Sequence, residues 1–233
     1  MQLFYAPLSA AVFLATTLAA PIPIRRACDE GIGGSTVITP EQLLQISSSM
    51  AACDPSSATA SECRTAEQAS PFVNEGFSTY NITTKGEKAA ILSLMLFESG
   101  NFKFDINHFP GEPGQGTRNL MKFPGVYQYA VDTPETSAQA LALVPDLNDP
   151  NNSNSTKNEV RALVLPDKLS FASGMWFYKA SGPEKTGCTG DQAIVDGLQG
   201  ETVEGWTAYI ERCISTTVTP DRKEVWEKTL AAL

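Results

Sequence analysis

The clearest helical pattern in the chain contains the apolar run AAILSLMLF, from Ala89 to Phe97. These residues are apolar on every side of a helical wheel, which is typical of a helix buried in the middle of a domain. Thr84-Lys85-Gly86-Glu87 has the spacing of a capping box before this run, and Gly100 follows it at the position of a C-terminal cap. We therefore predict a central helix over Lys85–Ser99.

Other segments with helical periodicity and start or stop signals surround this one. We expect helices over Pro40–Ser48, Thr65–Gly76, Asn119–Phe123, Thr136–Leu143, Lys157–Tyr178, Asp191–Leu198, Val203–Cys213 and Pro220–Leu233. Strand signals are scarce, and the loop Asn101–Thr117, rich in Gly, Pro and aromatic residues, is expected to hold at most a short hairpin. The predicted fold class is mainly α, of the α+β type, with a small irregular or β element after the central helix.

The N-terminal segment has the outline of a secretory leader. Met1–Ala20 is apolar and ends in small residues, as a signal peptide does. A membrane anchor is the less favoured alternative because the run is short and Pro21 and Pro23 follow it. Arg25-Arg26 resembles a dibasic processing site, so residues 21–26 are a candidate propeptide and residues 27–233 a single mature domain.

Secretion favours disulfide bonds and glycosylation. The simplest pairing of the five cysteines is Cys53–Cys63 and Cys188–Cys213, and it leaves Cys28 over. Pairing of Cys28 with Cys53 or Cys63 remains open, since sequence does not fix connectivity. Three sequons provide candidate glycosylation sites at Asn81, Asn151 and Asn154.

Composition narrows the classes of function. The chain has 233 residues, 42% of them hydrophobic, with 17 Lys+Arg against 26 Asp+Glu, a formal net charge of −9 and one histidine. The apolar content supports a real core, and the acidic balance argues against a nucleic-acid or anionic membrane surface as partner. The spacing of Cys and His matches no common structural zinc site, so we predict no metal and no cofactor.

One charged residue lies on the apolar face of the central helix. Ile91, Leu94 and Met95 follow helical spacing, and the next position on the same stripe is Glu98. Apolar surroundings and the negative end of the helix dipole favour a protonated carboxyl group there, which is what a general acid requires. The alternative is a structural glutamate paired with Arg118 or with nearby backbone.

The segments ILSLMLFESGNF and GQGTRNLMKFP together resemble the signature of lytic transglycosylases and goose-type lysozymes, in the lysozyme-like superfamily. In that signature a buried helix ends in a catalytic Glu-Ser pair, and a Gly-rich segment with Leu-Met opens the next helix. The resemblance covers Ala90–Pro124. Asn119 replaces the family glycine, Lys122 replaces the family glutamine, the intervening loop is longer, and a later aromatic motif has no counterpart. The segments GMWFYKASG and GWTAYIERCISTTVTPDRKEVW resemble small secreted fungal proteins associated with the same fold.

The resemblance implies a secreted glycoside hydrolase of muramidase or lytic transglycosylase type, with Glu98 as general acid at a β-1,4 bond next to an N-acetylated sugar. Glu112 lies where goose-type enzymes place a second acid, and Asp105 is a further candidate. The alternative for Glu112 is a solvated loop charge. Lytic transglycosylases use a single glutamate together with the N-acetyl group of the substrate, so a second acid is not required.

Residue chemistry suggests which other side chains would contact a polysaccharide. Amides, hydroxyls and charged groups suit sugar hydroxyl, acetamido and carboxylate groups, and aromatic rings suit sugar faces. The candidates are Asn107, His108, Gln115, Thr117, Arg118, Asn119, Tyr127 and Tyr129. A histidine that only packs in the loop is the commoner alternative for His108.

The net charge bears on the substrate. Peptidoglycan is the first candidate, but an acidic protein is repelled by an anionic wall at low salt. An acidic surface suits cationic chitosan, so a chitosanase or chitinase is the enzymatic alternative, and a non-catalytic glycan-binding or effector-like secreted protein is the third. We expect a monomer with no nucleic-acid or membrane partner. A Glu98 with no adjacent cleft, or one neutralised by Arg118, would remove the basis for an enzyme.

Overall fold

The computed structural model describes residues 37–233. The predicted signal peptide, the candidate propeptide and Cys28 lie outside the described residues. The described residues form one compact unit.

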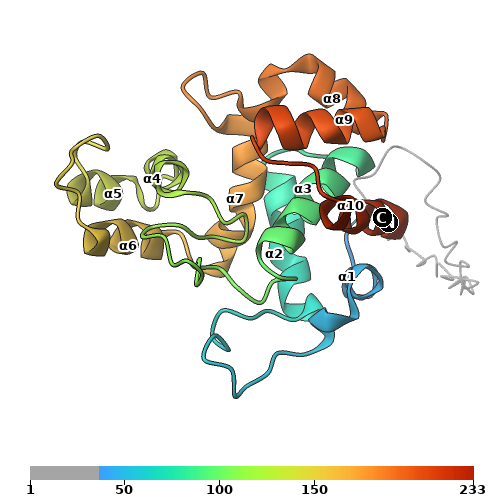
Figure 1. The fold of residues 1–233 in the computed structure, drawn as a ribbon, viewed down its shortest axis with the longest axis horizontal. Coiled ribbons are helices and arrows are strands. Elements are labelled where there is room, and N and C mark those ends of the chain that lie inside the picture. The colour runs from blue at the N-terminus through green and yellow to red at the C-terminus, as the bar shows by residue number, and fades with distance from the viewer. Residues whose placement is uncertain (1–36) are drawn as a thin grey trace, which may run out of the picture. The chain divides into compact units, whose positions relative to one another are not determined.

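The described chain is mainly helical, as the sequence predicts (Figure 1). Its only strand-like pairs are two isolated β-bridges, which join Gly116 to Ile106 and to Met121. The α-helices are α1 (Pro40–Ile46), α2 (Ala66–Thr79), α3 (Lys85–Glu98), α4 (Phe123–Asp132), α5 (Ser137–Leu143), α6 (Asn154–Leu163), α7 (Asp167–Ala180), α8 (Gln192–Gln199), α9 (Val203–Ala208) and α10 (Pro220–Ala232). Short 3₁₀ turns form η1 (Ser48–Ala51) and η2 (Gly187–Gly190), and the π-helical turn η3 (Tyr209–Cys213) continues α9.

The predicted central helix is α3. Thr84 caps its N-terminus by accepting a hydrogen bond from the Glu87 backbone N–H, and all residues from Gly86 to Leu96 are buried. The helix ends because Ser99 Oγ donates to the Met95 carbonyl and Gly100 takes a left-handed backbone, with φ of 59°. Helices α7, α8 and α10 pack directly on α3, so its last residue, Glu98, is held in a fixed position.

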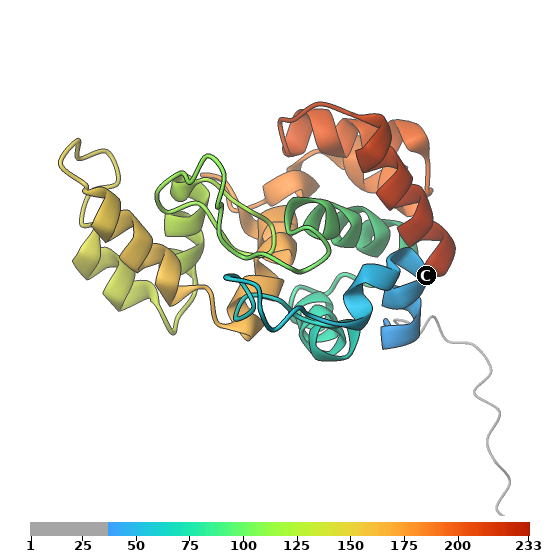
Figure 2. The same cartoon turned by 60° about the horizontal axis from the view of Figure 1, so that its bottom comes forward.

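Two groups of helices lie on either side of α7 (Figures 1 and 2). Each group has its own hydrophobic core. The larger core surrounds α3 and takes residues from α1, α2, α7, α8, α9 and α10. The smaller core joins α4, α5 and α6 to Trp176 of α7. Helix α7 therefore belongs to both cores and sets how the two groups of helices meet.

The segment predicted as one helix over Lys157–Tyr178 is two helices. Helix α6 ends at Leu163, and α7 begins after Pro166. A residue before proline avoids the helical region, because the proline ring clashes with its backbone. The break at Pro166 separates a helix of the smaller core from the helix shared by both.

The helix predicted over Asn119–Phe123 is wrong. Leu120 has a positive φ of 46°, and Met121 forms a β-bridge with Gly116. Helix α4 begins only at Phe123, where Pro124 occupies the first turn. The residues before α4 thus form a tight reversal, and the hairpin expected in the preceding loop is reduced to the two bridges at Gly116.

Both predicted local disulfides are present. Cys53–Cys63 closes the loop between η1 and α2, and Cys188–Cys213 joins η2 to η3. Each stabilises the fold by about 2–4 kcal/mol in the loop-entropy description. In the described part of the chain, no helix has the length and apolar character needed to span a membrane.

Candidate active site

Glu98 lies at the edge of a cavity of about 580 Å³. Its side chain is 22% exposed, whereas the residues of α3 from Gly86 to Leu96 are buried. The cavity lies between the end of α3, the segment before α4, α7 and the start of α10. Its lining residues are Leu94, Glu98, Gln115, Asn119, Leu120, Met121, Lys122, Pro124, Gly125, Phe177, Ile214, Ser215, Thr216 and Arg222. A cleft therefore adjoins Glu98, as a catalytic role requires.

The second motif of the resemblance reaches this same cavity through a tight chain reversal. Thr117 and Leu120 adopt left-handed backbone conformations, with φ of 70° and 46°. The Gln115 side-chain amide donates to the Leu120 carbonyl at 3.0 Å, and the Gly116 N–H donates to the Met121 carbonyl at 3.1 Å. These bonds close the reversal, and it turns Gln115, Asn119 and Lys122 toward the cavity that Glu98 lines.

Glu98 has a cationic partner that the sequence analysis did not foresee. Nη1 of Arg222 donates to Oε1 of Glu98 at 2.7 Å, and the guanidinium lies over the Phe97 ring, 4.2 Å from its centroid. Arg222 stands in the first turn of α10, whose N-cap is Thr219. Burial and the charge of Glu98 also raise the pKa of Tyr209, a fully buried phenol of η3. The pairing with Arg118, which the sequence analysis gave as the alternative, does not occur.

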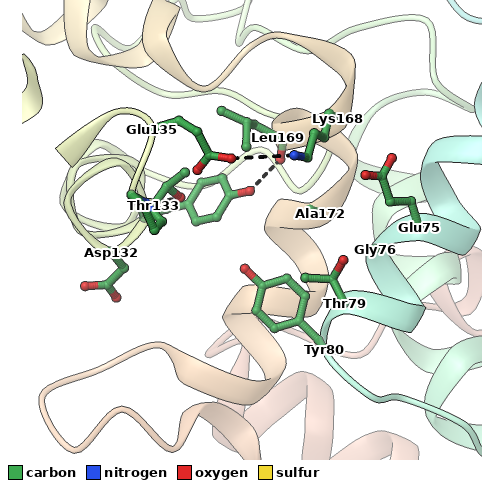
Figure 3. A pocket seen from close by; sticks show the side chains of 12 residues that line it. Glu75, Gly76, Thr79, Tyr80, Asp132, Thr133, Glu135, Lys168, Leu169 and Ala172 are labelled. Carbon is green, nitrogen blue, oxygen red and sulfur yellow. Dashed lines mark hydrogen bonds and ion pairs between the residues drawn. The ribbon is translucent and has the colours of Figure 1, made fainter.

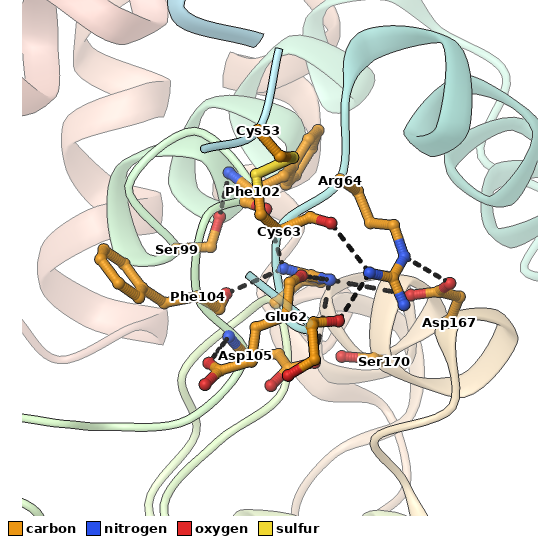
Figure 4. A network of polar contacts seen from close by, with 12 residues as sticks. Cys53, Glu62, Cys63, Arg64, Ser99, Phe102, Phe104, Asp105, Asp167 and Ser170 are labelled. Carbon is orange, nitrogen blue, oxygen red and sulfur yellow. Dashed lines mark hydrogen bonds and ion pairs between the residues drawn. A yellow bond between two sulfur atoms is a disulfide. The ribbon is translucent and has the colours of Figure 1, made fainter. Parts of the chain in front are cut away.

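Arg118 instead belongs to a buried polar network. Its partners in this network include Glu62, Phe102 and Phe104 (Figure 4). Its guanidinium is fully buried and donates to the carbonyls of Phe102, Phe104 and Glu62. Asp105 and Asp167 are 3.7 Å from its Nη2. Arg118 thus ties the Cys53–Cys63 loop to the segment after α3 and to the start of α7. It does not line the Glu98 cavity.

Asp105 belongs to this network and not to the cavity. Burial raises the pKa of its carboxyl group to about 6, against the opposing effect of Arg118, and the nearby Glu62 raises it further. The Asp105 backbone N–H donates to Glu62 Oε2 at 3.0 Å. Its surroundings are those of a structural carboxyl group under the loop.

The other loop candidates also stand apart from the cavity. Glu112 is exposed, His108 bonds to Glu62 Oε1 at 2.7 Å, and the Asn107 amide donates to Gln115 Oε1 at 2.6 Å. Thr117 is buried, and its hydroxyl accepts from Ser173. Of the residues predicted to bind substrate, Gln115 and Asn119 are the two on the cavity.

The two predicted aromatic platforms lie in the smaller core. The Tyr127 hydroxyl donates to the Val144 carbonyl, and the Tyr129 hydroxyl donates to the Leu169 carbonyl, each at 2.8 Å. Tyr129 also lines a second cavity of about 320 Å³ between α2, α4 and α7 (Figure 3). There, burial and the charges of Asp132 and Glu135 raise the pKa of Tyr80 to about 12.

The charge of the Glu98 cavity differs from that of the chain. Its charged lining residues are Glu98, Lys122 and Arg222, one acid against two bases, whereas the chain carries a formal charge of −9. Lys122 is exposed and forms no ion pair with any described residue. The cavity therefore favours neutral or anionic ligands over polycations.

The three sequon asparagines, Asn81, Asn151 and Asn154, are exposed, as glycosylation requires. Within residues 37–233, no group of three or more His, Cys, Asp or Glu side chains is arranged to hold a metal ion.

Arg222, Phe177 and the segment Ile214–Thr216 are lining residues that sequence reasoning missed. Arg222 is 124 residues from Glu98 in the chain, and no periodicity or motif relates the two positions. Its placement after Thr219 and Pro220 predicts the first turn of a helix, but not what that turn contacts.

Comparisons with known proteins give one partial relative. A bifunctional dioxygenase (DOX)-epoxy alcohol synthase (EAS) of Fusarium oxysporum (strain Fo5176) is 34% identical over 167 residues. The match covers 71% of this chain but 12% of that enzyme, so the chain spans a small part of its relative. No family model matches the chain, and no solved structure matches it.

Proposed function

We propose that this chain is a secreted glycoside hydrolase or lytic transglycosylase that cleaves β-1,4 bonds in an N-acetylglucosamine-containing polymer. The observation that carries the proposal is the meeting of Glu98 with Gln115, Asn119 and Lys122 on one cavity of about 580 Å³. These residues come from the two motifs on which the resemblance rests. The two disulfides agree with an oxidising, extracellular destination.

Glu98 is the group that would protonate the leaving glycosidic oxygen. Proton transfer from a carboxyl group to this oxygen assists cleavage as positive charge develops on the sugar. Leu94, Met121 and Phe177 give the cavity apolar walls that limit water around the reacting bond. Glu98, at the end of the buried helix α3, thus presents its carboxyl group to a cavity with apolar walls.

The amides of Gln115 and Asn119 suit recognition of an acetamido sugar. Asn119 is 8% exposed, and its Oδ1 has no hydrogen-bond partner among the described residues. A buried acceptor without a partner is costly, and an N–H or O–H group of a sugar would satisfy it after a small rotation of the amide. This acceptor without a partner, on a residue that lines the cavity, supports selection for an N-acetyl group.

Glu98 is the single acidic residue among those that line the cavity. A mechanism with two opposed carboxylates needs a second one within about 5–9.5 Å, and neither Glu112 nor Asp105 lines the cavity. We therefore favour a reaction in which the N-acetyl group of the substrate assists, as the resemblance to lytic transglycosylases implies. A polymer without acetyl groups would then be a poor substrate.

The charge of the cavity bears on the enzymatic alternative. Lys122 and Arg222 would repel the ammonium groups of chitosan but attract the carboxylates of peptidoglycan. We therefore place peptidoglycan before chitosan, although the net charge of the whole chain favours the reverse order. Neutral chitin remains compatible with the cavity.

The test is turnover of peptidoglycan, chitin and chitosan by the disulfide-bonded protein, followed as soluble glycan fragments separated by chromatography, which detects hydrolytic and transglycosylase products alike. Glu98→Gln is expected to abolish cleavage, and Glu112→Gln serves as a matched control that should leave it unchanged. Cleavage of chitosan alone would favour the alternative that the protein is a chitosanase. Binding without cleavage of any polymer would favour a non-catalytic glycan-binding protein.

The Fusarium relative raises oxygenase activity as a second function to consider. Its name describes a dioxygenase and epoxy alcohol synthase, and 34% identity over 167 residues indicates that one region of it resembles this helical unit. Because that match covers 12% of the enzyme, we infer a shared module and do not assign the oxygenase activity to this chain. Oxygen uptake that depends on this chain alone would overturn that inference.

A further inference from the structure

We propose that Arg222 is a positioning residue that an anionic group of the bound polysaccharide draws away from Glu98, so that substrate binding is coupled to protonation of Glu98. This inference rests on the proposed function, because it assumes that a glycan occupies the Glu98 cavity. It assigns a role to a residue that neither motif of the resemblance contains.

The contacts of Arg222 suit an exchangeable partner. One guanidinium nitrogen, Nη1, donates to Glu98 at 2.7 Å, and this is the single hydrogen bond of the guanidinium within the described residues. Nε and Nη2 therefore retain donors for a second acceptor. The stacking on Phe97 holds the plane of the group while Arg222 lines the cavity. An incoming carboxylate can thus bind before the bond to Glu98 is lost.

The ion pair opposes the acid role of Glu98 in the free protein. A guanidinium at 2.7 Å places a positive counter-charge beside the Glu98 carboxyl group, whereas a general acid must carry a proton. When a ligand carboxylate takes over Arg222, Glu98 loses part of its counter-charge and gains a negative neighbour. Both changes favour uptake of one proton from solvent by the Glu98 carboxylate, while Arg222 stays protonated throughout.

The other charged or titratable groups around Glu98 do not replace Arg222. Lys122, before α4, lines the same cavity but forms no bond to Glu98. Tyr209, from η3, is fully buried, and burial followed by the charge of Glu98 raises its pKa, so it stays neutral in the acidic to neutral range. Helix α7 contributes the apolar Phe177. Among the described residues, Arg222 of α10 is thus the charged group that bonds directly to Glu98.

Proton uptake on binding tests the coupling without requiring turnover. The probe is an anionic disaccharide of N-acetylglucosamine and N-acetylmuramic acid, with neutral di-N-acetylchitobiose as its matched control. Titration calorimetry near pH 6 in two buffers of different ionisation enthalpy counts the protons taken up. We expect the anionic probe to bind with uptake of up to one proton, and the neutral probe to bind with none.

Variants separate the proposed role from a merely structural clip between α3 and α10. Glu98→Gln and Arg222→Gln should each abolish proton uptake, and Arg222→Lys should restore part of it. Lys223→Gln removes one charge from the same turn of α10, where Lys223 pairs with Glu227, and should change nothing. Thermal unfolding of each variant verifies that it folds, and Arg222→Lys carries the test should Arg222→Gln fail to fold.

Equal proton uptake by the wild type and Arg222→Gln would overturn the proposal, as would failure of the wild type to bind the anionic probe. Proton uptake that depends on Arg222 in a protein that cleaves no polymer would leave the role of Arg222 intact. That result would instead refute the proposed catalytic function.

Discussion

At the residue scale, Glu98 and Asp105 are two carboxyl groups that lie near guanidinium groups but in different surroundings. Glu98 is partly exposed on a cavity and has one partner, Arg222, at 2.7 Å. Asp105 is buried under a loop, 3.7 Å from an Arg118 that is already occupied by backbone carbonyls. The first arrangement leaves a carboxylate accessible to a ligand, and the second holds the loop in place.

Asp105 should impose a pH dependence on stability. Its pKa in the folded protein, about 6, lies above the ordinary value of 3.8, so the folded state binds this proton more tightly than the unfolded chain. The free energy of unfolding should therefore fall as the pH rises from about 3.8 to about 6, with the loss complete above that range. Urea unfolding at several pH values measures it.

The Asp105→Asn variant should lose this contribution to the slope. The stability difference between the wild type and the variant should shift against the wild type by on the order of 1–3 kcal/mol between pH 4 and pH 7. Parallel pH profiles for the two proteins would show that Asp105 does not titrate in this way.

Sequence periodicity predicted that Glu98 ends the apolar face of the central helix, because the signal is local and consists of four positions on one helix face. It misjudged the surroundings of Arg118 because the partners of that residue lie on separate segments, from Glu62 to Asp167. A guanidinium that binds three backbone carbonyls leaves no pattern in sequence. The same limit explains why Arg222 was missed.

At the element scale, the close approach of α8 and α9 depends on two glycines. A Cβ on Gly205 would lie 2.2 Å from the carbonyl carbon of Gly197 and 2.4 Å from its Cα, so backbone meets backbone. These helices and η3 carry the chain toward Ile214–Thr216, which line the Glu98 cavity. Their packing therefore bears on the shape of the site.

Gly205→Ala should destabilise the protein by about 1–3 kcal/mol, because α9 must move away from α8 to make room for the methyl group. Gly125→Ala is the matched control, since the nearest contact of its Cβ would be the Met121 Cβ at 3.4 Å. Alanine at that helical position should leave stability unchanged or raise it by up to about 1 kcal/mol. Equal losses for both variants in thermal unfolding would contradict this account of the α8–α9 contact.

Element positions followed from local signals, and the errors arose where tertiary contacts prevailed. The start of α3 at Lys85 agrees with the Thr84 cap. The Glu87 carboxylate, expected to complete a capping box, instead accepts hydrogen bonds from the hydroxyls of Thr84 and Tyr178. Tyr178 lies on α7, 91 residues further along the chain, so the sequence near the cap could not reveal it.

At the scale of the whole molecule, the Glu98 cavity lies where the two hydrophobic cores meet. Leu94 belongs to the larger core and Met121 to the smaller one, and both line the cavity. Composition predicted an adequate apolar core but not its division into two. That division depends on the break at Pro166 and on α7, which contributes to both cores.

The contrast between an acidic chain and a basic cavity predicts an effect of salt. The formal charge of −9 should slow encounter with an anionic polymer at low ionic strength, and the Debye length of about 8 Å at 0.15 M removes most of that repulsion. The initial rate on peptidoglycan should rise between about 0.01 M and 0.15 M salt, whereas the rate on neutral chitin oligomers should not change. A steady fall on peptidoglycan over this range would contradict the expectation.

The most direct test of the central claim is fragment release from peptidoglycan by the wild type, Glu98→Gln and Glu112→Gln, with folding verified by thermal unfolding. Loss of the single carboxylate on the cavity should lower the rate by at least about 100-fold, the lower range for general acid catalysis, while Glu112→Gln should retain the wild-type rate. Turnover by Glu98→Gln at the wild-type rate would contradict catalysis at this site.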